Sequence, residues 1–255
     1  MASLVLALAL GSAGSIRAQV GAPVQALLEP EYLLSVGEVV DAERWRNAEA
    51  VVGAAGETMV TDRSQTQFDL VHVPRVVEGR SLVTGDLVQF FRLERRLDDP
   101  VTGEPLGTLL LPTGVGRVES LDGETAGVRI THAFHAIVVG DLVRVVMETR
   151  TAPATGFAGG AGGTVVAFQE EKAIHPPFDK IFLRPEMAGS TAPGQVVELY
   201  RPGPVRDGVQ LPDLVLGRAM VVRDGGGIAA AVTYELERPD LAPGDHFRTV
   251  VAGGN

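Results

Sequence analysis

An internal repeat constrains the fold of this chain more than any other feature of its sequence, because repeated segments fold as repeated structural units. The matched segments, in chain order, are 68–73 with 178–183, 85–92 with 194–201, 106–107 with 216–217 and 140–146 with 244–250. Four matched segments in one order predict that the chain holds two tandem copies of one domain.

The best matches have the pattern of a turn that leads into a strand. Gly85, Gly140 and Gly244 are each followed by Asp, and Gly194 by Gln, before apolar and polar residues alternate. Glycine supplies the positive φ of a tight turn, and alternation of period two is typical of a strand with one buried face. Each copy contains five or six such strands. The sequence therefore predicts an all-β fold, with two tandem copies of a small barrel-like or sandwich-like domain and a short N-terminal helical segment.

Composition divides the rest of the chain. The predicted order is a signal peptide at 1–18, a lead-in with a short helix at 19–50, the first β-domain at 51–150, a Gly-rich linker at 151–163 and the second β-domain at 164–251. The apolar run 4–10 has the length of a signal-peptide core and is too short to span a bilayer, and cleavage is expected after Ala18. The helix is expected at 39–50, around Trp45. Because each copy has a full set of strands and should bury a core of its own, we expect few contacts to cross the linker.

Charge and cysteine content exclude several classes of function. The formal net charge is −10, and the chain has no cysteine. Nucleic-acid and acidic-lipid partners need clustered cations, so neither is expected, and the mature protein should be peripheral to a membrane at most. Without cysteine there is no disulfide framework, no thiolate nucleophile and no Cys-ligated zinc.

No group of residues predicts catalysis, a cofactor or a metal. His132 and His135 stand three apart, which places them on opposite faces of a strand. The acidic run 98–104 contains Pro and Gly and is typical of a solvated loop, although Asp98, Asp99 and a second acid in one pocket would favour a hydrolase. The glycines at 159–163 lack the ending of a phosphate-binding loop.

The residues predicted to bind a ligand are Arg92 with Phe91 and, at the matched positions, Arg201 with Tyr200. An arginine beside an aromatic ring can bind a carboxylate or stack on a sugar. The alternative is that each arginine closes the end of its strand onto a neighbouring acid.

The run Asp99-Pro100-Val101-Thr102-Gly103-Glu104-Pro105-Leu106-Gly107, followed by Ile137-Val138-Val139-Gly140-Asp141, resembles the region that follows the LysM domain in a family of secreted bacterial LysM peptidoglycan-binding proteins. The resemblance covers roughly 33–146 and implies an envelope setting and a non-catalytic companion domain. LysM itself is not evident, since the nearest candidate at 32–40 lacks the rest of its pattern. The glycan-binding residues of LysM therefore have no counterpart here.

Three functions follow as alternatives. The first is a non-catalytic accessory or binding protein, secreted to the periplasm or cell envelope, whose partner is cell-wall glycan or another envelope protein. The second is an envelope hydrolase with a cleft between the β-domains. The third is an oligomeric subunit of a surface or secretion assembly, in which exposed strand faces pair between copies.

Overall fold

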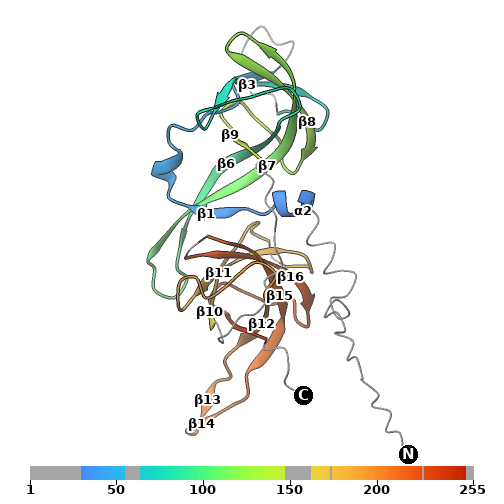
Figure 1. Cartoon of the computed structure of the whole chain (residues 1–255). Helices are drawn as coiled ribbons and strands as arrows, with labels where there is room; N and C mark the ends of the chain where they lie inside the picture. The colour runs from blue at the N-terminus through green and yellow to red at the C-terminus, as the bar shows by residue number, and fades with distance from the viewer. Residues whose placement is uncertain (1–29, 55–63, 147–161, 173, 226, 251–255) are drawn as a thin grey trace, which may run out of the picture.

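The computed structural model describes residues 30–54, 64–146, 162–172, 174–225 and 227–250. The predicted signal peptide lies outside these residues, as does most of the predicted linker. Figure 1 shows two β-structures stacked along the long axis of the molecule, with helix α2 (Pro30–Leu34) and strand β1 (Glu38–Val40) between them. The predicted all-β class is confirmed. None of the described helices has both the length and the apolar character needed to cross a membrane.

The first structure is a seven-stranded antiparallel sheet, here the N-terminal sheet. Its path is β2-β3-β8-β7-β6-β9, and β1 pairs with β7. The strands are β2 (Gly53–Ala54), β3 (Leu70–Pro74), β6 (Leu87–Asp98), β7 (Pro105–Asp122), β8 (Thr125–Ala133) and β9 (Leu142–Val145). A two-stranded hairpin, β4 (Val76–Val77) and β5 (Arg80–Ser81), follows β3. The amide of Val51 donates to the carbonyl of Asp141 at 2.8 Å, so the chain just before β2 meets the edge beside β9 and the sheet curls around its own apolar core.

The second structure is a closed six-stranded antiparallel barrel, here the C-terminal barrel. Its order is β10-β11-β16-β15-β12-β17. The strands are β10 (Gly162–Phe168), β11 (Lys180–Pro185), β12 (Val196–Arg201), β15 (Leu214–Asp224), β16 (Ala229–Leu236) and β17 (His246–Thr249). A short hairpin of β13 (Val205–Arg206) and β14 (Val209–Gln210) projects from it (Figure 1). The barrel core contains Phe247 and Leu199, both fully buried.

The lead-in and the linker differ from the sequence prediction. The predicted helix at 39–50 is wrong: β1 occupies its start, and Ala42–Trp45 forms only a 3₁₀ turn capped by Asp41. Gly163, predicted as linker, belongs to β10. A Cβ at this position would lie 2.2 Å from the carbonyl oxygen of Arg184, so the glycine is required by the close approach of β11.

The expectation of few contacts between the two structures is also wrong. A shared apolar cluster joins them, and we call this interface the junction. From the N-terminal side it contains Val36, Leu97, Leu109 and Leu111, and from the barrel Val166, Ala167, Phe182, Met220, Val222, Ala230 and Val232. In Figure 1 the β6–β7 hairpin extends beyond the N-terminal sheet and lies beside β10. The two structures therefore pack against each other across a continuous hydrophobic interface.

Candidate functional site

Arg92, the first predicted ligand-binding residue, is bonded to a carboxylate of its own sheet. Its Nε and Nη2 atoms donate to the two oxygens of Asp141, each at 2.8 Å, and Nη2 also donates to the carbonyl of Ala136 at 2.9 Å. Asp141 is buried and accepts a further bond from the amide of Val138 at 3.2 Å. The pair fastens β6 to the turn that precedes β9.

Arg201 makes the same arrangement in the C-terminal barrel. Its Nε and Nη2 atoms donate to Asp245 at 2.7 and 2.9 Å, and Nη2 donates to the carbonyl of Asp240 at 2.8 Å. Asp245 also accepts from the amide of Ala242 at 2.8 Å. Both arginines thus have the geometry expected when an arginine closes a strand end onto an acid.

The two predicted aromatic partners lie apart from each other, one on each structure. Phe91 is fully buried against Trp45, with ring centroids 6.1 Å apart, and has no surface to offer a ligand. Tyr200 packs beneath the guanidinium of Arg248, 4.5 Å from its ring centroid. Ligand binding by these residues stays a prediction. The pockets that could hold a ligand lie at the junction.

The acidic run 98–104 forms the tip of the β6–β7 hairpin and is hydrogen-bonded to the barrel. Asp99 Oδ1 accepts from the amides of Val101 and Thr102, both at 2.8 Å, which holds the turn closed. Asp99 Oδ2 accepts from Arg184 Nη1 at 2.6 Å, and Glu104 accepts from Arg184 Nη2 at 3.0 Å. Burial raises the pKa of the Asp99 carboxyl, but the three hydrogen bonds outweigh it and hold the pKa below its usual range. The run is therefore a contact between the two structures.

A buried glutamine makes a second polar contact across the junction. The amide of Gly37 donates to Gln169 Oε1 at 2.7 Å, and Gln169 Nε2 donates to the carbonyl of Ser35 at 3.1 Å. Gln169 is only 3% exposed, so loss of either bond would leave a polar group buried without a partner. The two bonds fix the segment between α2 and β1 against the end of β10.

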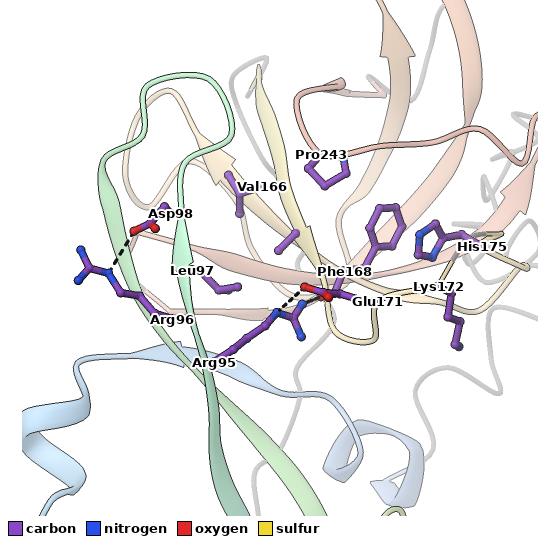
Figure 2. Close-up of a pocket in the computed structure, with 11 residues that line it drawn as sticks. Arg95, Arg96, Leu97, Asp98, Val166, Phe168, Glu171, Lys172, His175 and Pro243 are labelled. Carbon is purple, nitrogen blue, oxygen red and sulfur yellow. Dashed lines mark hydrogen bonds and ion pairs between the residues drawn. The ribbon is translucent and has the colours of Figure 1, made fainter.

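A pocket of about 360 Å³ opens at this junction. Figure 2 shows its lining, which comes from the β6 end of the hairpin, from β10, from the loop after β10 and from Pro243. The ionisable side chains in it are Arg95, Arg96, Asp98, Glu171, Lys172 and His175. Arg95 pairs with Glu171 and Arg96 with Asp98, each at 3.1 Å. Cations and anions are thus interspersed, as suits a ligand carrying both charges or several hydroxyl groups.

His175 contacts both a carboxylate and an aromatic ring at this pocket. Its Nδ1 lies 2.7 Å from Asp179 Oδ2, and its ring stacks on Phe168 with centroids 3.4 Å apart. Asp179 Oδ1 also accepts from Lys172 at 3.1 Å. The carboxylate and the stacked ring therefore hold the His175 imidazole in one orientation.

A smaller pocket of about 160 Å³ adjoins the first and shares Lys172 with it. It is lined by Tyr32, Gln169, Glu170, Lys172, Phe178, Asp179 and Lys180. The Tyr32 hydroxyl donates to the carbonyl of Phe178 at 2.9 Å. Burial, with a contribution from the Asp179 charge, raises the pKa of Tyr32 to about 12, so the phenol stays protonated at neutral pH.

Metal binding finds no support in the described part of the chain, where no three residues among His, Cys, Asp and Glu come together as ligands. His132 lies on β8, paired with Val115, whereas His135 lies beyond the end of that strand. Cofactor binding was not predicted, and no residue pattern suggests one.

The chain matches no model of a known protein family. No curated protein matches its sequence either. The case for a function therefore depends on the geometry of the junction and on the sequence itself.

Sequence reasoning missed most of the junction residues. Arg184 and Gln169 follow no motif, and their roles depend on partners 85 and about 130 positions away in the chain. One signal was present: Lys172 and Lys180 are the only two lysines of the sequence, which otherwise relies on arginine. Both line the smaller pocket.

Proposed function

We propose that this chain is a non-catalytic binding protein of the bacterial cell envelope, built from two copies of one β-barrel that act as a single rigid body. Its partner is cell-wall glycan or another envelope protein, held at the junction. The observation that carries the proposal is the junction itself, where an apolar cluster, a hairpin contact and the larger pocket coincide. Pockets between two rigid domains are common ligand sites.

Matched backbone contacts support the duplication. The strand path of the N-terminal sheet corresponds, strand by strand and in chain order, to that of the C-terminal barrel. Phe68 and Phe178 have φ of 74° and 71°, and their amides donate to the carbonyls of Ile130 and Thr233. Positive φ is rare for a bulky residue, so its recurrence at matched positions favours a common origin for the two structures.

The envelope setting rests on the predicted signal peptide and on the resemblance of 33–146 to the LysM-associated region. Export is tested by N-terminal sequencing of the protein recovered from the envelope fraction of a producing bacterium. A sequence that begins just after Ala18 is expected. Protein found only in the cytosol and still carrying Met1 would contradict the proposal.

Partner choice is tested by sedimentation with isolated peptidoglycan at low and at physiological salt. We expect weak retention, since the LysM pattern is missing, and this result would direct the search to a protein partner. Retention that survives physiological salt would identify the glycan as the partner. In either case no soluble glycan fragments should be released, and their release would replace the binding proposal with an enzymatic one.

A hydrolase is the second candidate, favoured by one observation: Asp98, Glu171 and His175 line the same pocket. Asp99, by contrast, faces Arg184 and not the pocket. If the chain releases glycan fragments, Asp98→Asn and Glu171→Gln should abolish release while leaving the melting temperature within about 2 °C of the parent, because substitutions of exposed polar groups change stability little. Unchanged release in both variants would exclude this pair of carboxylates.

A further inference from the structure

The smaller pocket contains an amine that its surroundings leave without an ion pair. Lys180 lies at the start of β11, and its ammonium stands 5.6 Å from the ring centroid of Tyr32. Among the described residues no carboxylate lies within ion-pair distance of it. The neighbouring carboxylates have other partners: Asp179 pairs with Lys172 and His175, and Glu170 pairs with Lys172. The nearest charges thus act on Lys180 only from a distance.

Lys172 provides a contrast within the same pocket. Its Nζ lies 3.0 Å from Glu170 and 3.1 Å from Asp179, and its side chain is more than a third exposed. The hydrogen bond to Glu170 raises the pKa of Lys172. Burial lowers the pKa of Lys180, an effect opposed only in part by the more distant charges of Glu170 and Asp179. The pKa of Lys180 is therefore lowered where that of Lys172 is raised, and Lys180 is the less exposed of the two.

We propose that Lys180 is a reactive amine that captures a small aldehyde or ketone as an imine within this pocket. The chain uses arginine for nearly all its cations and carries its two lysines here, and lysine, unlike arginine, can lose its proton and act as a nucleophile. The pocket volume of about 160 Å³ equals the share of roughly five water molecules, which limits the ligand to a few non-hydrogen atoms.

The chemistry balances without an oxidant or a reductant. The ammonium first gives its proton to water, and the neutral nitrogen then adds to the carbonyl carbon. The nitrogen loses two protons and the carbonyl oxygen takes up two, the first as the carbinolamine forms and the second as the C–O bond breaks, so that the oxygen leaves as water and the C=N bond forms. Tyr32 and Phe178 line the pocket beside the amine. The inference does not depend on the envelope assignment.

The test uses the full-length mature protein, propanal as the carbonyl compound and cyanoborohydride to trap the imine as a stable secondary amine. After brief labelling at pH 7, proteolysis that cuts after Phe178 places the two lysines on different peptides, and mass spectrometry gives the labelled fraction of each. We expect Lys180 to be labelled at least about tenfold faster than Lys172, and the ratio to fall toward one in denaturant. Labelling of Lys180 should also have its midpoint at a lower pH.

The design separates reactivity from access. Lys172 is the more exposed lysine, so access alone would label it first, and equal or faster labelling of Lys172 in the native protein would overturn the proposal. Lys180→Arg is the matched control, because it keeps a cation at this position but removes the nucleophilic amine, so the folded variant should show no labelling of the peptide that follows Phe178. Labelling of this peptide in a folded Lys180→Arg protein would also count against the proposal.

Discussion

Replacement of Arg184 by Met tests whether the N-terminal sheet and the C-terminal barrel unfold as one unit. The substitution keeps most of the aliphatic stem and removes the bonds to Asp99 at 2.6 Å and to Glu104 at 3.0 Å. Bonds to charged groups contribute about 1.5–3 kcal/mol, but exposed pairs contribute about 0–1. Since Asp99 is 5% exposed and Arg184 37%, we expect a loss of about 1–2 kcal/mol, near the middle of these limits.

The single tryptophan makes the measurement specific. Trp45 lies on the N-terminal side, packed against Phe91, whereas Arg184 lies on β11 of the barrel. Trp45 fluorescence therefore reports unfolding of the N-terminal side alone, whereas circular dichroism reports the strands of both the N-terminal sheet and the barrel. With a urea dependence of about 2 kcal/mol/M, the substitution should lower the midpoint of both signals by about 0.5–1 M.

A Trp45 midpoint that stays unchanged while the circular dichroism transition shifts would refute this reasoning, because it would show that the barrel unfolds independently. A double-mutant cycle with Asp99→Asn supplies the control. The two substitutions remove the same interaction, so their effects should fall short of additivity by about 1 kcal/mol. Full additivity would mean that the Asp99–Arg184 bond does not stabilise the junction.

Three further predictions follow from the junction and from the histidines. Leu109→Ala should cost about 2–4 kcal/mol in urea unfolding, since Leu109 is fully buried in the junction cluster; a loss below about 1 kcal/mol would mean that the two sides separate readily. Because the pKa of Asp99 is lower in the folded than in the unfolded chain, its ionised form stabilises the fold above the usual carboxyl pKa of about 4. This contribution should disappear as the pH falls below that value through the native pKa. Between about pH 5 and 2, Asp99→Asn should therefore lose less stability than the parent. Replacing His132 and His135 together by Ala should leave the zinc content, measured by plasma mass spectrometry, unchanged, and stoichiometric zinc that disappears in the variant would contradict this.

Local patterns in the sequence predicted the strands and turns well. Turn residues before alternating segments marked β6, β9, β12 and β17, and Asp122-Gly123 is the turn between β7 and β8, with Gly123 at φ 54°. These features depend only on neighbouring residues. The helix predicted at 39–50 failed because Val39 and Val40 pair with β7 and Trp45 packs on Phe91 of β6.

The junction could not be predicted because the repeat itself suggested that matched residues share one environment. One warning was present in the sequence. Residues 181–183 and 229–232 are continuously apolar, whereas the matched strand at 70–74 alternates. Continuous apolar runs are typical of strands covered on both faces. The apolar runs of the C-terminal barrel therefore predict that its outer face is buried against another part of the chain. Nothing in the sequence identifies the β6–β7 hairpin as that part.

The outer faces of the N-terminal sheet and of the C-terminal barrel differ in polarity, which explains how the first structure packs on the second. Lys180 pairs with Val232 in the barrel as Leu70 pairs with Arg129 in the N-terminal sheet, which sets the correspondence of positions. By the same register, Phe182 and Met220 of the barrel wall correspond to His72 and Arg117.

The apolar wall is buried against the hairpin, and the polar wall carries ion pairs such as Arg129 with Glu119. An apolar wall is stable only when covered, and a charged wall loses hydration energy when covered. The β6–β7 hairpin of the N-terminal sheet therefore packs on the outer face of the barrel, and the barrel has no matching contact with the outer face of the N-terminal sheet among the described residues. The charged outer face of the N-terminal sheet therefore disfavours an equivalent domain packed there.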